Sequence, residues 1–288
     1  MDTREVISRT FKSKLFLAFT IGCTAIASGR VLGALADLFI GGYQFGKVTS
    51  FLISLLIALP AILTAYYSWM LYMDNVSENN ILSVKKYMTF IKVISVILTV
   101  LMAIVLFAMV LVGILMMIVF SDESVKSEII AGLNAEIGAE LGAEAADTVS
   151  AYAEMLGASM IFLIIALVVF FGGFIFVLVC FSKMCKMVCR YFEGYSKAYA
   201  DGDVYIFEKL PITRLWIFGA LFGISGLASI TLDTFSAISN MGAALMMISL
   251  AMWLEETNDV HVKRRDEINA EREREFEENK DNKDWIIL

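Results

Sequence analysis

The chain has 288 residues, of which 59% are apolar and 18% charged, and its mean hydropathy is +0.74. A soluble domain is about 45–50% apolar and about 25% charged, so the apolar excess is more than one core can hold. The composition therefore excludes a disordered chain, a coiled-coil rod and a small disulfide scaffold, and it predicts a multi-pass membrane protein.

Five long segments of the chain contain no charged residue. They hold 26, 29, 28, 18 and 21 residues and are bounded by Lys47 and Asp74, Lys92 and Asp122, Glu154 and Lys183, Arg214 and Asp233, and Asp233 and Glu255. A helix needs about 20 apolar residues to cross a bilayer, and an open strand could not satisfy its backbone groups in lipid. With a first, less regular segment they predict an all-α bundle of six spans, at about 15–40, 48–73, 93–120, 159–182, 215–232 and 235–254.

The first segment is irregular because a charge interrupts it. Only 15 residues separate Lys14 from Arg30, and the apolar pattern then resumes as far as Ile40. We interpret 15–40 as one helix that carries Arg30, and Asp37 near its end. A cleaved signal peptide is the alternative, since Ala25 and Ala27 precede Ser28 in an A-x-A-like site. A lipoprotein signal ending at Cys23 is a weaker alternative, because Thr20 stands where a branched apolar residue is wanted.

The basic residues predict the orientation of the bundle. Of 23 lysines and arginines, 20 fall before the first span, between spans 2 and 3, between spans 4 and 5, or after the last span. Positive residues stay on the cytoplasmic side, so both termini are expected in the cytoplasm of a cell whose plasma membrane holds the protein. The expected division is a transmembrane bundle at 1–254 and a charged cytoplasmic tail at 255–288.

The bundle is expected to include an external acidic helical segment at 121–158. This segment carries eight acidic residues against one lysine, a balance of −7 that equals the net charge of the whole chain. Apolar residues recur every four positions from Ile129 to Leu141, which indicates a helix. A solvated helical cap is the favoured interpretation. An electronegative surface for a divalent cation or a basic partner is the alternative.

Two cytoplasmic segments are candidates for contact with a partner. In 183–200, methionines and tyrosines recur at helical spacing among basic residues, which is typical of an amphipathic helix lying along the membrane interface. Docking of a protein partner is the alternative for that segment. The tail carries 12 acidic and 7 basic residues and is expected to form a solvated helix or a disordered arm.

Several kinds of chemistry are missing from the sequence. The only histidine, His261, lies in the charged tail, so a histidine-based catalytic relay or zinc site in the membrane is excluded. There is no P-loop motif. Cys180, Cys185 and Cys189 cluster at the end of span 4, but their spacing is not C-x-x-C and they are expected to be packed thiols. We expect no enzymatic activity, no cofactor, no metal and no nucleic-acid partner.

Arg30 is the principal candidate for a polar site inside the membrane. A charge within a span costs a few kcal/mol on insertion scales and tends to face the bundle interior or a watery cavity. Asp37, two turns further along, and Asp233, at the turn between spans 5 and 6, are candidate partners. The site is expected either to bind an anionic solute or headgroup or to be a structural arginine.

Small residues mark candidate surfaces for close helix packing. Gly29 and Gly33, and Gly219 and Gly223, both match the small-xxx-small motif. They predict that spans 1 and 5 pack tightly on neighbouring helices, within the chain or in a homo-oligomer. Pro60 is expected to kink span 2.

The runs Phe11–Leu17, Leu59–Leu63 and Tyr87–Lys92 together resemble a group of uncharacterised multi-pass membrane proteins of Gram-positive bacteria. The resemblance covers roughly the first 120 residues. It implies a bacterial cell-membrane protein and carries no activity with it.

Two functional classes remain after these exclusions. The first is a non-enzymatic accessory or scaffold component that works through the acidic segment, the 183–200 helix and the tail. The second is a permease-like unit for a small solute or lipid, possibly beside a separate ATPase. The few charges within the spans favour the first class.

Overall fold

The computed structural model describes residues 3–39, 45–121, 128, 131 and 143–284, and all regular secondary structure in these ranges is helical. The helices are α1 (Thr3–Phe11), α2 (Lys14–Phe39), α3 (Phe45–Tyr72), α4 (Glu78–Val84), α5 (Lys86–Ser121), α7 (Ala143–Asp201), α8 (Ile212–Ser229) and α9 (Thr234–Asp284). Most of the expected acidic segment at 121–158 lies outside the described residues and side chains.

Six helical segments in the described part of the chain are long and apolar enough to cross a membrane. This finding confirms the expectation of a helical chain with six helices that could span a membrane. The first of them, α2, continues without a break past Arg30. Pro60 lies inside the continuous helix α3.

Two of the helices extend far beyond the spans expected from the sequence. Helix α7 has 59 residues and continues through the segment 183–200, and α9 has 51 residues and includes most of the tail. No proline interrupts either helix, so neither has a strong stop signal where its apolar part ends. The left-handed residue Gly202, with φ of +76°, follows α7 directly, as is typical of a helix end.

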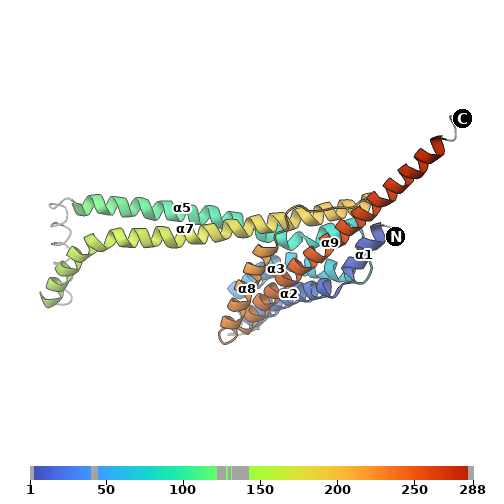
Figure 1. The fold of residues 1–288 in the computed structure, drawn as a ribbon. Coiled ribbons are helices and arrows are strands. Elements are labelled where there is room, and N and C mark those ends of the chain that lie inside the picture. Colours follow the sequence, from blue (N-terminus) through green and yellow to red (C-terminus); the bar gives the residue numbers. More distant parts are fainter. Residues whose placement is uncertain (1–2, 40–44, 122–127, 129–130, 132–142, 285–288) are drawn as a thin grey trace. The chain divides into compact units, whose positions relative to one another are not determined.

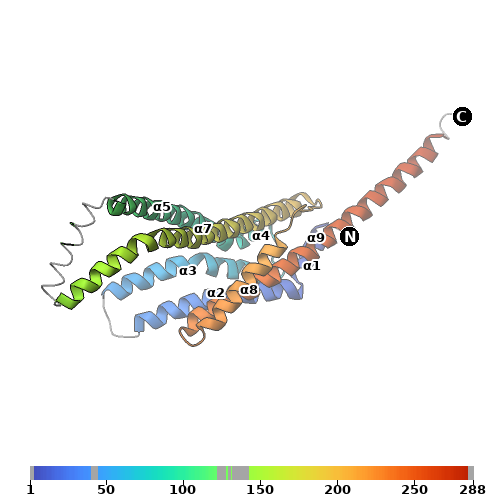
Figure 2. The same cartoon turned by 60° about the vertical axis from the view of Figure 1, so that its left-hand side comes forward.

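The chain forms two compact units. One consists of residues 94–180, and the other of residues 1–93 with 181–288. The smaller unit holds most of α5 and the apolar part of α7, which run side by side (Figures 1 and 2). Gly113 allows their approach, because a Cβ atom there would lie only 2.7 Å from the Cδ1 atom of Ile164.

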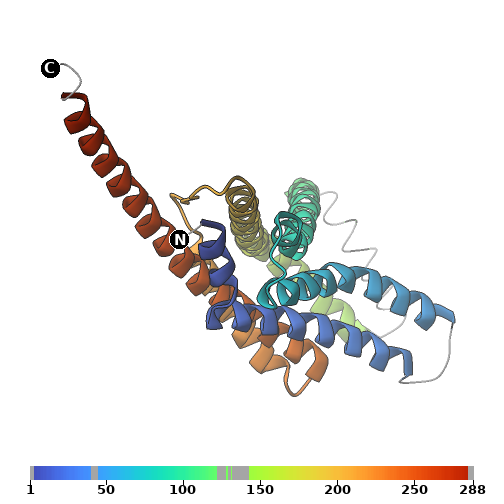
Figure 3. The same ribbon diagram turned by 90° about the vertical axis from the view of Figure 1, so that its right-hand side faces the viewer.

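Helix α2 is central in the larger unit, where it packs against α3 and α9, while α8 packs against α9. Figure 3 shows α9, in orange to red, crossing α2, in blue. Glycines on both helices make the crossing close. A Cβ atom on Gly22 would lie 2.6 Å from the backbone nitrogen of Met246, and one on Gly242 would lie 2.9 Å from that of Ile26.

A core of aromatic side chains ties together α1, α2, α7 and α9 at one end of this unit. Trp253 is fully buried, its ring centroid lies 5.9 Å from that of Phe192, and its indole N–H donates to the Thr10 carbonyl at 3.0 Å. Phe11 lies edge-on to Phe16, with 4.9 Å between ring centroids. We call this cluster the aromatic core; its members are Phe11, Phe16, Tyr191, Phe192, Tyr195 and Trp253.

His261 extends the aromatic core along α9. Trp253, Thr257 and His261 follow one another at four-residue spacing, and all three are fully buried. The His261 ring stands edge-on to Tyr195 at 5.2 Å, and neither ring nitrogen has a hydrogen-bond partner among the described residues. The sequence placed His261 in a solvated tail, whereas the structure places it in the core.

The burial of His261 predicts a pH-dependent stability. This residue lies past Glu255 and Glu256, beyond the apolar part of α9. Burial lowers the pKa of the His261 imidazole to about 4. The unfolded chain binds a proton below pH about 6.5, and the folded chain does so only near 4, so acidification favours unfolding. The free energy of unfolding should therefore fall by up to about 3 kcal/mol between pH 6.5 and 4.

Thermal unfolding of the purified protein at pH 7, 6 and 5 measures this effect. His261→Phe keeps an aromatic ring in the core and removes the titrating group, so it should flatten the dependence in this window. An equally steep dependence in the His261→Phe variant would show that other groups cause it.

Candidate functional site

A polar cavity lies in the larger unit between α2, α3 and the start of α9. Its volume is about 330 Å³. The three residues that the sequence singled out, Arg30, Asp37 and Asp233, all line it. The remaining polar lining comes from the side chains of Ser54, Ser236, Ser239 and Asn240. The structure therefore gathers the predicted polar residues around one cavity.

Arg30 is an exposed residue on α2, and its guanidinium lies beside the Tyr87 hydroxyl at the start of α5. Neither Asp37 nor Asp233 is within ion-pairing distance of Arg30 among the described contacts. A guanidinium carries five N–H donors, so one hydroxyl leaves most of them available. Tyr87 could not be expected from the sequence, because a tyrosine 57 residues away along the chain gives no sign of this contact.

The two carboxylates of the cavity have different surroundings. Asp233 caps the N-terminus of α9: it accepts hydrogen bonds from the backbone N–H groups of Phe235 at 3.0 Å and Ser236 at 3.2 Å, and from the Ser236 hydroxyl. These bonds and the helix dipole stabilise its charge, and the hydrogen bonds hold its pKa below the usual value. Asp37 is exposed and has no such partner among the described residues. The cavity therefore presents one cationic and one anionic side chain, Arg30 and Asp37, that form no ion pair with any residue in the described part of the chain.

The four predicted packing glycines differ in what surrounds them. Gly29 is held at a backbone crossing, because a Cβ atom there would lie 2.8 Å from the Phe235 carbonyl oxygen. A Cβ atom on Gly33 would meet the Phe235 side chain at 3.2 Å, and one on Gly219 would meet the Ile248 side chain at 2.8 Å. On Gly223 it would make an ordinary contact of 3.7 Å. The backbones of α2 and α9 thus approach most closely at Gly22, Gly29 and Gly242. Of these three glycines, only Gly29 belongs to a G-x-x-x-G motif in the sequence.

The cysteine cluster lies at the end of the apolar part of α7. Cys185 and Cys189 are buried, and the Cys185 Sγ atom lies 4.0 Å from the Met88 Sδ atom. Cys189 is 3.4 Å from the Thr89 hydroxyl. Within the described ranges, no group of three or more His, Cys, Asp or Glu side chains is placed to hold a metal ion.

The segment 183–200 packs inside the larger unit. Its apolar face, expected to lie along a membrane interface, contains the buried residues Met184, Val188, Tyr191 and Tyr195. These side chains belong to or adjoin the aromatic core, so the chain itself covers the face that a partner or lipid would need. The helical spacing of these residues correctly predicted one face of a helix, but a single sequence does not reveal what covers that face.

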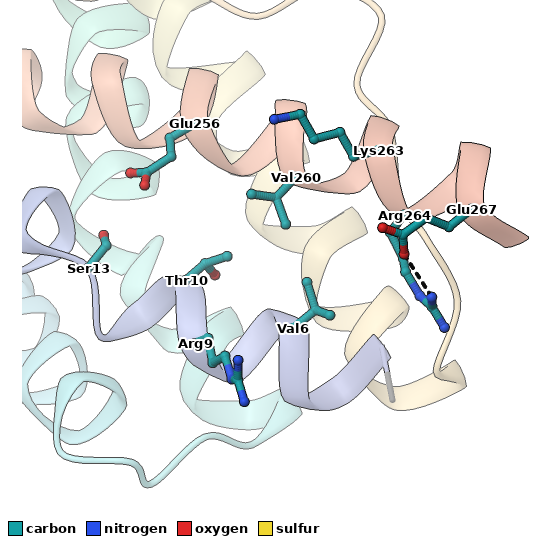
Figure 4. A pocket seen from close by; sticks show the side chains of 9 residues that line it. All are labelled: Val6, Arg9, Thr10, Ser13, Glu256, Val260, Lys263, Arg264 and Glu267. Carbon is teal, nitrogen blue, oxygen red and sulfur yellow. Dashed lines mark hydrogen bonds and ion pairs between the residues drawn. The ribbon is translucent and has the colours of Figure 1, made fainter. Parts of the chain in front are cut away.

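A groove of about 400 Å³ separates α1 from α9 beside the aromatic core (Figure 4). Val6 on α1 and Val260 on α9 point toward each other across it, and Arg9 on α1 and Lys263 on α9 also line it. Arg264 is paired with Glu267 at 2.9 Å at one end. The charges of opposite sign around the groove nearly balance, so it has no strong electrostatic preference.

Beyond this groove, α9 continues as a separate helical arm (Figures 1 and 2). Every residue from Arg265 to Glu278 is exposed except the half-buried Ile268. We call 265–284 the charged arm. It supports the helical alternative for the tail over the disordered one within the described residues.

Comparison of the chain with protein-family models, with curated proteins and with solved structures found no match.

Proposed function

We propose that this protein is a non-enzymatic accessory or scaffold component of a bacterial cell membrane. In this proposal six spans anchor the chain, both termini lie in the cytoplasm, and the charged arm of α9 docks a partner protein. The basic residues support this orientation, since all but three of the 23 are on the side assigned to the cytoplasm.

The observation that carries the proposal is the continuity of α9. Its apolar part packs between α2 and α8, its middle is held by the aromatic core, and its last 20 residues are the charged arm. At about 1.5 Å per residue the arm reaches roughly 30 Å beyond the core. The arm is helical but buries almost no side chain within the described chain, and a partner surface would give such a helix something to pack against.

Photo-crosslinking in native membranes tests the docking role. A photoreactive amino acid replaces Phe276, which is 73% exposed on the charged arm. The matched control replaces Trp216, which is 43% exposed on α8 and is expected to face lipid. We expect one discrete protein adduct from position 276 and none of the same mass from position 216.

Charge reversal on the arm tests whether the adduct is specific. Arg272→Glu with Arg274→Glu leaves the helix-forming character of the arm intact and should reduce the adduct at least tenfold. Lys209→Glu, on the loop between α7 and α8, is the control and should leave it unchanged. No discrete adduct at 276, or an adduct that survives charge reversal, would argue against the scaffold function.

The polar cavity favours one alternative, a permease-like subunit that moves a small solute or lipid, possibly with a separate ATPase. Arg30 is the residue expected to contact such a substrate. Solute or lipid movement that is lost in Arg30→Gln and unaffected by removal of the charged arm would favour this alternative over the scaffold.

A further inference from the structure

The polar cavity between α2, α3 and α9 has the size of a small ligand site. Its volume of about 330 Å³ is at the lower end of typical ligand pockets, which measure about 300–1,000 Å³. Asp233, at the turn from α8 into α9, lies on its rim, so the cavity is at the end of the unit opposite the aromatic core. The close approach at Gly29 fixes its wall between α2 and α9.

The charges around the cavity define what it can bind. Arg30 and Asp37 lie two turns apart on α2, about 10 Å along the helix axis. The described contacts include no ion pair between them. Asp233 is occupied by the cap of α9. One cation and one anion are therefore available, separated by a gap.

A ligand that carries a single charge would pair with only one of these groups and leave the other without a charged partner. A zwitterion satisfies both, with its oxyanion at the Arg30 guanidinium and its ammonium at the Asp37 carboxylate. Ser54, Ser239 and Asn240 also line the cavity, and their hydroxyl and amide groups can donate or accept hydrogen bonds.

We propose that this cavity binds a zwitterion built from a phosphate or carboxylate and a primary ammonium. Two sources share this chemistry: the ethanolamine phosphate headgroup of a membrane lipid, and a free water-soluble zwitterion. The inference goes beyond the scaffold function and does not depend on the charged arm, so either can fail without the other.

Binding of three lipids to the delipidated full chain tests the proposal by native mass spectrometry. The probes are phosphatidylethanolamine, with phosphate and primary ammonium; phosphatidylglycerol, with phosphate and an uncharged glycerol; and phosphatidylcholine, whose quaternary ammonium has no N–H. We expect the ethanolamine lipid to bind at least fivefold more tightly than either of the others, because only its headgroup brings a cationic N–H donor to the Asp37 carboxylate.

Substitutions assign the two charges. Asp37→Asn should remove the preference for phosphatidylethanolamine over phosphatidylglycerol, and Arg30→Gln should weaken binding of both at least fivefold. Arg190→Gln and Asp201→Asn, at exposed positions of α7, are matched controls and should bind as the unmodified chain does. If Arg30→Gln does not fold, the proposal is still tested by the lipid preference of the unmodified chain and by the loss of that preference in Asp37→Asn.

Competition distinguishes the two sources. Displacement of the ethanolamine lipid by soluble O-phosphoethanolamine would support a free zwitterion as the ligand, and lack of displacement would support the lipid headgroup. Equal binding of phosphatidylglycerol and phosphatidylethanolamine, or an unchanged preference in Asp37→Asn, would overturn the proposal.

Discussion

Replacing Trp253 by alanine is expected to lower the free energy of unfolding by about 3–5 kcal/mol, the range for removal of a fully buried large aromatic side chain. Trp253 has the largest side chain of the aromatic core, and its neighbours come from α1, α2 and α7. Its loss would leave a cavity among rings that cannot collapse independently, and would leave the Thr10 carbonyl without its indole donor.

Thermal unfolding in detergent measures this change. At roughly 2–4 °C per kcal/mol for a domain of this size, the midpoint should fall by on the order of 10 °C. Trp216→Ala is the matched control, since the same side chain on α8 is 43% exposed and should cost far less. Equal losses in the two variants would show that the aromatic core does not hold this end of the unit together.

Replacing Gly22 by alanine is expected to destabilise the crossing of α2 and α9, although alanine is the better helix former by about 1 kcal/mol. The added Cβ atom would lie 2.6 Å from the Met246 backbone nitrogen and 2.8 Å from the Gly242 carbonyl oxygen. Backbone atoms cannot rotate away as a side chain can, so the two helices must separate. We expect a net loss of about 1–3 kcal/mol, the usual cost of overpacking, or more.

Gly223→Ala supplies the control for this prediction. Its Cβ atom would lie 3.7 Å from that of Ala244, which is ordinary contact, so the helix propensity of alanine should leave stability unchanged or slightly raised. If the crossing at Gly22 is tight, the free energy of unfolding should fall in Gly22→Ala and stay the same or rise slightly in Gly223→Ala, measured under the same conditions. A stabilised Gly22→Ala variant would contradict the crossing.

Arg30 and its neighbours show how far a single sequence can predict a site. A charge inside an apolar segment stands out without any structure, and Asp37 and Asp233 were the nearest carboxylates to be expected at that depth. The sequence did not show that Asp233 caps α9 or that Tyr87 lies beside Arg30, because these contacts depend on the turn geometry and on how α5 begins. The proposed zwitterion site depends on this difference between the two carboxylates.

The segments that the sequence assigns to the cytoplasm show the opposite case. Met184, Tyr191 and Tyr195 were correctly placed on one helical face, but an amphipathic face can meet lipid, a partner or the chain itself. His261 was assigned to a solvated tail because its sequence neighbours are charged. His261 follows Trp253 and Thr257 at four-residue spacing, which is consistent with one buried helical face. The charged residues between these positions made the segment look solvated in the sequence.

The sequence by itself determined the helical class, the number of apolar helices long enough to span a membrane and the position of a charge within the first of them, because these follow from the lengths of uncharged runs. Only the tertiary structure decided which glycines hold the crossing of α2 and α9, which face the aromatic core covers, and which carboxylate of the cavity is left open. These properties depend on distances between segments far apart in the chain, and helix periodicity carries no information about them.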